Sequence, residues 1–338
     1  MSLLPFLHRV SSGEHLSSAD AHRAMSAILE GGATDATLAG FLVALRMKGE
    51  TAAELAGFAR AMRERAIYVD AGESVVDTCG TGGDAAGTFN ISTLAGLVMA
   101  GAGAKVAKHG NRSISNPGGG SAELFHALGV RFEMTPEQAA RAVREIGIGF
   151  LFAPSLHPAM KHAQPVRREL KMRTVFNLLG PLANPARARR QLIGAPSPVA
   201  AKLMAEALAE LGTEHAFVVH GHDGLDEIST TSTTDVYEVR KGQVSRQVWS
   251  PEDFRVRRAM LSELKGGDPA RNAEIAREVL SGAKGPRRDI VLVNAAAGLL
   301  VAGLAGDLQS AMAKAAESID SGAAAERLDQ LRKNFPSE

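Results

Sequence analysis

Glycines and hydroxyl side chains gather between residues 78 and 93, where the sequence reads Thr-Cys-Gly-Thr-Gly-Gly-Asp-Ala-Ala-Gly-Thr-Phe-Asn-Ile-Ser-Thr. A glycine backbone can approach a ligand closely and can adopt a positive φ without steric cost. Ser92 and Thr93 are good residues to begin a helix, and a glycine turn that leads into a helix start directs free N–H groups at an anion. The stretch therefore predicts a phosphate site.

Two other phosphate-binding motifs fit this stretch less well. Gly80, Gly82 and Ala85 match the loose dinucleotide pattern G-x-G-x-x-G/A, but the acidic residue expected about 20 positions onward is missing, since no Asp or Glu occurs from Ala85 to Ala122. No G-x-x-x-x-G-K-[ST] occurs either, which argues against a P-loop NTPase. A purely structural glycine turn remains an alternative for this stretch taken alone.

Two further polar loops follow predicted strands. The first, Lys108-His109-Gly110-Asn111-Arg112, places a lysine charge just beyond a strand end, although a basic surface turn would explain it equally well. The second, residues 220–227, carries the adjacent carboxylates Asp226 and Glu227, which suit Mg²⁺ better than zinc because the histidines lack zinc-ligand spacing. Taken alone, this loop is an ordinary turn. Together the three loops predict a pocket for a magnesium-bound diphosphate.

The elements that must position these loops follow from the pattern of apolar residues. Residues 1 to about 68 carry helix signals only, with caps expected at Ser17 or Ser18 and at Thr34. Beyond them strands alternate with helices, which predicts a mostly parallel sheet with its ligand loops at the carboxyl ends of the strands. The expected strands are 74–78, 104–107, 148–152, 191–193, 215–220, 236–240 and 244–249, with a weaker candidate at 130–133.

The predicted fold class is thus α/β, with a small all-helical N-terminal lobe and a large α/β lobe around a mostly parallel central sheet. Residues 1–70, joined by helices from about 157–185, are expected to form the small lobe. Residues 71–156 and 186–338 are expected to form the large lobe.

Composition narrows the function. The 338 residues include 38 basic and 37 acidic ones, so no broad face for nucleic acid or membrane is expected. Cys79 is the only cysteine, which rules out an intrachain disulfide and suits a reducing compartment. The N-terminus has no signal-peptide pattern, and the longest apolar stretch, 290–306, is interrupted by Asn294 and glycines. A cytoplasmic protein is expected.

No base partner for Cys79 is evident, so a cysteine nucleophile is disfavoured.

Several motifs in the same order resemble the anthranilate phosphoribosyltransferase family of tryptophan biosynthesis, and the resemblance covers nearly the whole chain. The matching segments are Asp77-Thr78-Cys79-Gly80-Thr81-Gly82-Gly83-Asp84, Phe89-Asn90-Ile91-Ser92-Thr93, Lys108-His109-Gly110-Asn111-Arg112, His157-Pro158-Ala159-Met160, residues 173–182 and residues 219–227. The resemblance implies a homodimer that joins anthranilate to phosphoribosyl pyrophosphate (PRPP) with release of diphosphate, using Mg²⁺. Because diphosphate leaves readily once Mg²⁺ and Lys108 offset its charge, we expect no covalent enzyme intermediate.

The resemblance also assigns residues to ligands. For PRPP it implies Gly80, Gly83, Asp84, Thr88, Asn90, Ile91, Ser92, Thr93, Lys108, His109, Gly110, Asn111, Arg112, Ser113, Ile114, Ser115, Asn116 and Ser121. For anthranilate it implies Gly80, Asn111, His157 and Arg167, with the arginine pairing to the carboxylate. For magnesium it implies Ser92, Asp226 and Glu227. It assigns no catalytic group, because positioning and electrostatic stabilisation supply the rate.

This sequence departs from the family in one loop. The family usually has a serine-rich segment after its Lys-His-Gly-Asn stretch, whereas residues 115–123 here are Ser-Asn-Pro-Gly-Gly-Gly-Ser-Ala-Glu, and Lys171 replaces a common glycine. Fewer hydroxyl contacts to phosphate predict a raised KM for PRPP. Two alternative functions stay open at this point: a pyrimidine nucleoside phosphorylase of the same fold, and a catalytically silent relative that binds nucleic acid.

Overall fold

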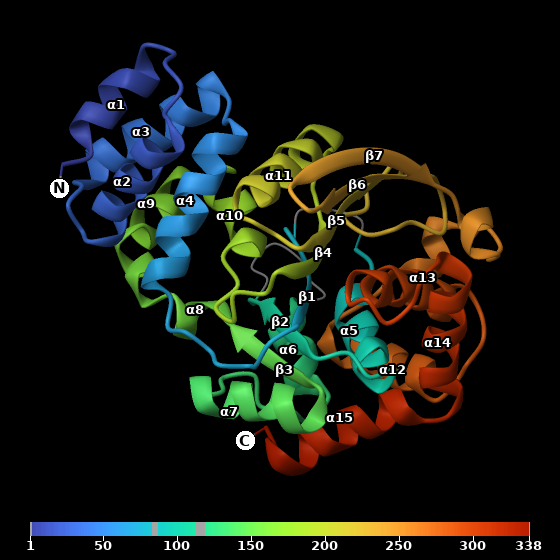
Figure 1. Cartoon of the computed structure of the whole chain (residues 1–338). Coiled ribbons are helices and arrows are strands. Elements are labelled where there is room, and N and C mark those ends of the chain that lie inside the picture. The colour runs from blue at the N-terminus through green and yellow to red at the C-terminus, as the bar shows by residue number, and fades with distance from the viewer. Residues whose placement is uncertain (1, 83–86, 113–118, 338) are drawn as a thin grey trace.

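The computed structural model describes residues 2–82, 87–112 and 119–337. Four helices open the chain and pack on one another as a small group (Figure 1). They are α1 (Leu4–Ser11), α2 (Ser18–Leu29), α3 (Asp35–Lys48) and α4 (Ala52–Arg65). The hydroxyls of Ser17, Thr34 and Thr51 cap α2, α3 and α4 by accepting backbone N–H groups, as the sequence predicts for the first two.

A seven-stranded sheet forms the centre of the rest of the chain (Figure 1). Its strands lie in the order β3-β2-β1-β4-β5-β6-β7. The first five of these are parallel to one another, and β6 and β7 add an antiparallel hairpin at one edge. The strands are β1 (Val76–Gly80), β2 (Val106–Gly110), β3 (Ile148–Phe152), β4 (Arg190–Gly194), β5 (His215–Gly221), β6 (Thr234–Arg240) and β7 (Gln243–Trp249). The predicted fold class is confirmed.

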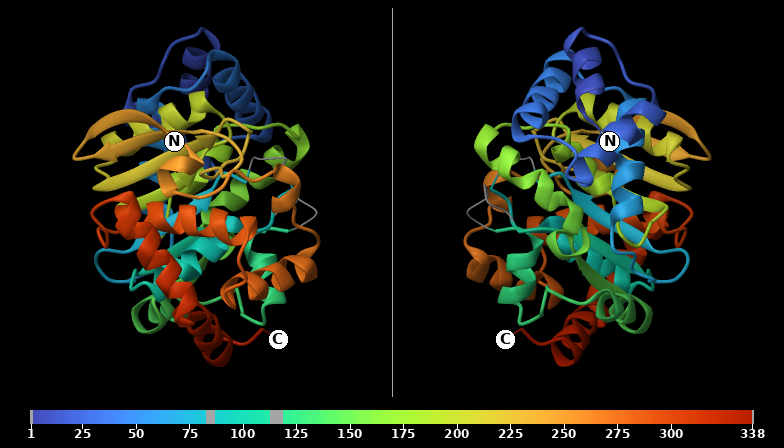
Figure 2. Two further views of the ribbon diagram at one scale, coloured as in Figure 1. Left: turned by 90° about the vertical axis from the view of Figure 1, so that its right-hand side faces the viewer. Right: turned by 90° about the vertical axis from the view of Figure 1, so that its left-hand side faces the viewer.

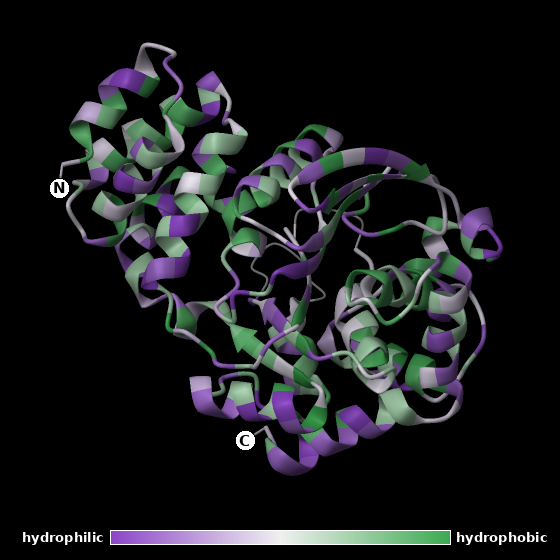
Figure 3. Ribbon diagram, viewed as in Figure 1, coloured by the Kyte–Doolittle hydropathy of each residue, from purple (hydrophilic) through white to green (hydrophobic). Residues whose placement is uncertain are grey.

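Helices cover both faces of the sheet, and Figure 3 shows the hydrophobic residues concentrated in the strands and in the helices next to them. One hydrophobic cluster holds α5 (Ile91–Gly101) and the C-terminal helices α12 (Pro269–Leu280), α13 (Pro286–Val301), α14 (Leu308–Asp320) and α15 (Ala323–Asn334). The other joins α1–α4 to α10 (Phe176–Leu182) and α11 (Pro198–Glu210). Alternate strand residues serve the two clusters: Leu192 and Phe217 belong to the first, and Ile193 and Val218 to the second.

Short elements complete the chain. The helices are α6 (Ser121–Ala127), α7 (Pro136–Arg141), α8 (Ala153–Leu156) and α9 (Gln164–Leu170), with a π-helical turn η1 (Ala142–Ile146) and 3₁₀ turns η2 (Pro158–His162), η3 (Pro251–Phe254) and η4 (Leu261–Leu264). In both views of Figure 2, α1–α4 lie at one end of the molecule and α15 at the other. No helix in the described part of the chain is long and apolar enough to cross a lipid bilayer.

The N-terminal helices gain partners from the middle of the chain. The 3₁₀ turn η2 contacts α2, and α9 contacts α3; we call α1–α4, η2 and α9 the helical lobe. The chain therefore passes between this lobe and the sheet three times: after α4, after β3 and before β4. The three connections are hydrogen-bonded to one another, since the Ile67 N–H donates to the Leu156 carbonyl (2.9 Å) and the Val69 N–H donates to the Pro185 carbonyl (3.2 Å).

Three strand predictions need correction. β1 and β2 begin and end two or three residues later than expected, so Lys108 lies inside β2 rather than in a loop beyond it. Polar residues are tolerated in these strands because hydrogen bonds satisfy them, as described below. The predicted strand at 130–133 is wrong: it forms only an isolated bridge between Val130 and Pro336. The hairpin turn at Lys241-Gly242 is confirmed, with positive φ at both residues.

Candidate active site

The carboxyl ends of the parallel strands meet around β1, where the strand order changes direction. β1 has β2 on one side and β4 on the other, and the segment after β1 leads to α5, which belongs to one face. The connection from β3 to β4 passes instead through the helical lobe on the other face. Such a switch point leaves a crevice at the strand ends, where ligands bind in open α/β sheets.

Asp226 lies directly against the end of β1. Its Oδ2 accepts hydrogen bonds from the Gly82 N–H (3.1 Å) and the Thr81 hydroxyl (3.4 Å). A Cβ on Gly80 would lie 2.7 Å from this oxygen, and a Cβ on Gly194 would lie 1.6 Å from the Asp226 carbonyl oxygen. Glycine at both positions is therefore what lets the 220–227 loop approach the ends of β1 and β4 this closely. The loop carries the half-buried Glu227 next to Asp226.

Lys108 connects β2 to β1 and to the start of α5. Its side chain is 2% exposed, and its Nζ donates to the Thr78 carbonyl (2.5 Å) and the Ser92 hydroxyl (3.3 Å). Burial lowers the pKa of Lys108, and the negative charges of Asp77 and Glu227 oppose that shift. A polyanionic ligand at the strand ends would stabilise the cation further.

Asp77 holds the neighbouring strand in register from the opposite face of the sheet. Its carboxylate accepts the His109 N–H at 3.0 Å and the Cys79 thiol at 3.4 Å. Burial raises the pKa of Asp77, while hydrogen bonds from Asn184 and from the His109 backbone act in the other direction. Asn184 also donates to the Ala107 carbonyl at 2.9 Å. Burial raises the pKa of the Cys79 thiol well above its usual value, so Cys79 is a poor nucleophile.

His109 and His157 form a buried pair beside these strand ends. Their ring centroids lie 5.2 Å apart, and His109 Nδ1 is 3.1 Å from the Gly180 carbonyl, so Nδ1 carries the proton. Burial and the neighbouring His157 lower the pKa of His109 to about 3, and burial lowers the pKa of His157 to about 4. Both rings are neutral at pH 7. Neither Nε2 has a hydrogen-bond partner among the described residues.

Arg167 lies on α9 within the helical lobe. Its guanidinium carbon is 5.1 Å from the centre of the Phe176 ring, and burial lowers the pKa of Arg167. In the part of the chain that the structure describes, no carboxylate lies within ion-pair distance of it. A partly desolvated arginine stacked on an aromatic ring is well suited to pair with the carboxylate of a small aromatic ligand.

The remaining predicted residues surround the start of α5 and the end of β2. The Asn90 amide donates to the Gly119 carbonyl (3.4 Å), and its oxygen accepts from Asn272 (3.3 Å). A Cβ on Gly110 would lie 2.3 Å from the Ser121 hydroxyl, so the start of α6 lies close to the end of β2. Thr88 pairs with Lys265 in an isolated bridge.

Four residues make different contributions. Ile91 and Thr93 are buried in α5, so Ile91 has only its backbone to offer a ligand. The Arg112 guanidinium lies over the Phe132 ring at 4.7 Å and reaches Glu133 at 3.5 Å, which directs it away from Lys108. The Asn111 side chain accepts the Arg112 N–H at 2.7 Å. Gly83, Asp84, Ser113, Ile114, Ser115 and Asn116 lie outside the described residues, as do Pro117 and Gly118 of the departing loop.

Sequence reasoning did not find Asn272, Asn184 or Thr78. Asn272 accepts the Gly267 N–H at 2.9 Å. Its bond to Asn90 connects α12 to the start of α5. Thr78 contributes a backbone carbonyl, which any residue type would supply. No local signal identifies these residues, because their partners are distant in the sequence.

The chemistry of the oxygen donors fits Mg²⁺. Among the described residues no cluster of three or more His, Cys, Asp and Glu side chains occurs that could hold a metal alone. Magnesium needs no such cluster, because it keeps several waters and takes one or two carboxylates together with ligand phosphates. Asp226 and Glu227 supply carboxylates that are adjacent in the sequence, and glycine at position 80 avoids a Cβ contact of 2.7 Å with Asp226 Oδ2.

Family models and a curated relative match this chain over nearly its whole length. The family model described as glycosyl transferase family, a/b domain, matches residues 72–325, and the helical bundle domain of the same family matches residues 4–66. A relative from Solibacter usitatus, named anthranilate phosphoribosyltransferase, is 60% identical, and the match covers 98% of each chain.

Solved structures also match over nearly the whole chain. Anthranilate phosphoribosyltransferase from Thermus thermophilus has a TM-score of 0.92 at 44% identity, with 99% of each chain covered. The Saccharomyces cerevisiae enzyme in complex with PRPP and Mg has a TM-score of 0.88 at 31% identity, covering 98% of this chain and 97% of that one.

Proposed function

The chain belongs to the anthranilate phosphoribosyltransferase family, and we propose that it transfers the phosphoribosyl group of PRPP to the amino group of anthranilate, releasing diphosphate. The observation that best supports this function is the meeting of the Gly80–Gly82 turn, Lys108 and Asp226 at the carboxyl ends of the strands. Neither a nucleoside phosphorylase nor a silent nucleic-acid-binding protein is favoured by the comparisons.

PRPP is assigned to the crevice at the ends of β1 and β2. Lys108 would offset phosphate charge, the Gly80 turn would offer backbone N–H groups, and Ser121 would close the pocket at α6. The further PRPP residues of this proposal are Gly83, Asp84, Thr88, Asn90, Ile91, Ser92, Thr93, His109, Gly110, Asn111, Arg112, Ser113, Ile114, Ser115 and Asn116. For Arg112 the proposal is limited to its backbone, since its side chain lies over Phe132.

Mg²⁺ is assigned to Asp226 and Glu227, with the Ser92 hydroxyl as a further ligand. When bound, the ion offsets the charge of the departing diphosphate. The Lys108 cation does the same from the protein side, since its Nζ is 3.3 Å from the Ser92 hydroxyl. Diphosphate then leaves without a strong general acid.

Anthranilate is assigned to the side of the crevice that faces the helical lobe. Arg167 would pair with its carboxylate, and Gly80, Asn111 and His157 would contact the ring and amine. The rings of His109 and His157 are neutral at pH 7, so they offer this site an uncharged aromatic surface. Holding the amine near the ribose C1′, which becomes cationic as diphosphate departs, supplies the rate by positioning.

No covalent bond between enzyme and ribose is part of this mechanism. Cys79, the only cysteine, is buried and keeps its proton, since burial raises its thiol pKa. Mass spectrometry of the enzyme quenched during turnover should detect no ribosyl adduct. A stable adduct on any side chain would contradict the mechanism.

The assembly and the division into lobes belong to the same proposal. Residues 1–70, with helices from 157–185, would form the small lobe, and two copies of the chain would join through it. Met47 is 83% exposed in this lobe, which suits a subunit contact. The single free thiol fits the reducing environment of the cytoplasm.

The deciding experiment follows the fluorescence of anthranilate as it is consumed in the presence of PRPP and Mg²⁺. Loss of signal that requires all three components supports the transfer. Parallel samples with thymidine or uridine and inorganic phosphate should release no free base. Phosphorolysis in those samples, with no use of anthranilate, would refute the proposed function.

A further inference from the structure

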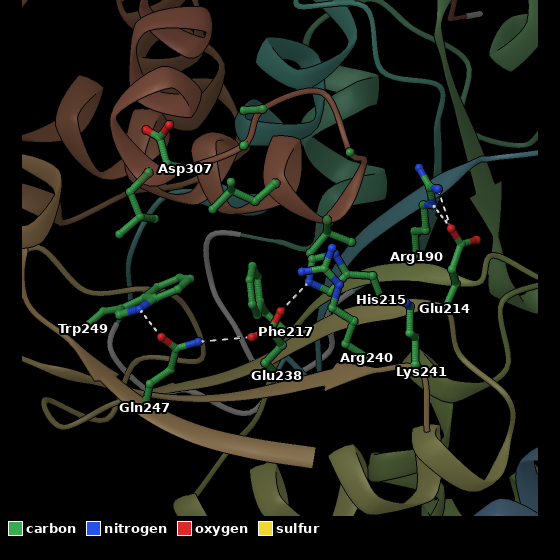
Figure 4. A pocket seen from close by; sticks show the side chains of 16 residues that line it. Arg190, Glu214, His215, Phe217, Glu238, Arg240, Lys241, Gln247, Trp249 and Asp307 are labelled. Carbon is green, nitrogen blue, oxygen red and sulfur yellow. Dashed lines mark hydrogen bonds and ion pairs between the residues drawn. The ribbon is translucent and has the colours of Figure 1, made fainter. Parts of the chain in front are cut away.

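A cavity of about 540 Å³ lies at the opposite end of the strands from the candidate active site (Figure 4). Arg190 and His215, which line it, are the first residues of β4 and β5. β5 has seven residues, and a strand rises about 3.3 Å per residue, so the cavity and the active site lie roughly 20 Å apart. The volume falls within the range of about 300–1,000 Å³ that is usual for small-molecule sites.

One wall of the cavity is aromatic and aliphatic. The rings of Phe217 and Trp249 meet edge to face, with their centroids 5.0 Å apart. Leu300 and Leu308, near the end of α13 and at the start of α14, also line the cavity. Figure 4 shows the Trp249 indole extending along this wall from β7. Such a wall offers favourable contact to a flat ring.

The acidic groups of the cavity already have partners. Glu214 forms an ion pair with Arg190 at 2.5 Å. Glu238 accepts from His215 Nε2 at 2.9 Å. The Asp307 carboxylate caps α14 by accepting a backbone N–H of that helix. These carboxylates are therefore satisfied within the protein, and none of them calls for a cationic ligand.

Two cations of the cavity have no such partner. Arg240 ends β6, and Lys241 follows it in the hairpin turn, with both side chains exposed at the cavity mouth. No carboxylate within the described ranges lies within ion-pair distance of either side chain. The positive charge of Arg240 contributes to the lowered pKa of His215, after the larger effect of burial. Both side chains are therefore available to pair with an anionic group that enters the cavity.

We propose that this cavity is a second ligand site, which takes a small aromatic carboxylate. The ring packs against Phe217 and Trp249, and the carboxylate pairs with Arg240 and Lys241. Arginine is the residue best suited to bidentate recognition of a carboxylate, and an aromatic body at the other end matches the apolar wall. Binding of a carboxylate at this site requires no turnover, so the site can be tested independently of the transferase reaction.

Trp249 is the only tryptophan of the chain, which makes it a specific reporter. The probe is 3-phenylpropionate, which has a single ring, absorbs little where tryptophan is excited and lacks the aromatic amine of an acceptor. Titration of the full-length protein should change the Trp249 emission in a saturable way at submillimolar concentration. The uncharged analogue 3-phenylpropanamide should bind roughly tenfold or more weakly, because it cannot form the charge-assisted contacts.

Variants locate the bound probe. The double variant Arg240→Gln/Lys241→Gln should weaken 3-phenylpropionate binding roughly tenfold or more, whereas Lys314→Gln should not change it. Lys314 is exposed on α14 outside the cavity, so Lys314→Gln is the control for losing a positive charge elsewhere on the surface. Gly306→Leu provides a second test, since a Cβ at this lining position meets nothing within 4 Å and a larger side chain can enter the cavity.

Each result bears on the proposal. Tight binding that the double variant weakens and Gly306→Leu abolishes supports it. Three outcomes would overturn it: no saturable change of Trp249 emission, equal affinity for the acid and the amide, or an unchanged affinity in the double variant with its fold intact by circular dichroism.

Discussion

Lys108→Met is the most informative perturbation of the candidate active site. Methionine keeps most of the volume of the buried side chain and removes the ammonium group, which donates to the Thr78 carbonyl at 2.5 Å and to the Ser92 hydroxyl at 3.3 Å. In the proposed function this ammonium group also pairs with a phosphate of PRPP, and a hydrogen bond to a charged group contributes about 1.5–3 kcal/mol. Because each 1.36 kcal/mol is a factor of ten in rate, kcat/KM for PRPP should fall roughly 10- to 150-fold.

The assay measures anthranilate consumption by fluorescence at varied PRPP and saturating Mg²⁺. The control is Lys105→Met: Lys105 is exposed just before the same strand, and its Nζ donates to the Arg144 carbonyl at 2.7 Å, away from the crevice. We expect the control to keep kcat/KM within about twofold, as surface substitutions away from special features usually have small effects. The KM for anthranilate should change little in either variant.

The reasoning would be refuted by a Lys108→Met enzyme that is folded and has normal kcat/KM for PRPP. It would also be refuted if the loss were explained entirely by a smaller folded fraction, because Lys108 would then serve only to connect the strands. Thermal unfolding and gel filtration of both variants separate these cases.

Three further predictions concern neighbouring groups. Asp226→Asn should raise the Mg²⁺ concentration needed for half-maximal rate roughly tenfold or more, since it removes a carboxylate charge; an unchanged Mg²⁺ titration would exclude Asp226 as a ligand. Arg167→Gln should raise the KM for anthranilate roughly tenfold or more with little change in the KM for PRPP, and equal effects on both would argue against a carboxylate contact. The low pKa values of His109 and His157 should reduce stability as pH falls below about 6.5, because the unfolded chain takes up protons that the folded rings refuse; stability should be complete above that value. Chemical denaturation between pH 7 and pH 4 should show a loss of about 1 kcal/mol per pH unit for each histidine, and His157→Gln should flatten the slope.

The sequence predicted the sheet and the three loops because apolar runs are local signals. The runs near residues 76, 106 and 215 mark strands whatever surrounds them, and parallel strands place their following loops at one end. The same logic misplaced the ends of β1 and β2. Lys108 resembles a loop residue by polarity, whereas its hydrogen bond to the Thr78 carbonyl satisfies it inside β2. Gly80 resembles the start of the glycine-rich turn, but it still pairs with Gly194 at the end of β1.

The parts that could not be predicted depend on contacts between distant segments. Asn272 reaches Asn90 across 182 positions of sequence, and Asp226 reaches Gly82 across 144. The predicted strand at 130–133 failed for the same reason. Its apolar Val130 packs in the core beside the chain end at Pro336, which supplies a single bridge and no strand partner. Periodicity in one segment carries no information about such partners.

The three linked connections between the helical lobe and the sheet have a consequence for proteolysis and for motion. A protease that cuts one exposed connection leaves two intact, so a nicked chain should stay in one piece under native conditions and separate only in denaturant. A swing of the lobe about its base must also bend Ile67, Leu156 and Pro185 together, because hydrogen bonds join their segments. The three linked connections therefore limit the directions in which the helical lobe can move relative to the sheet.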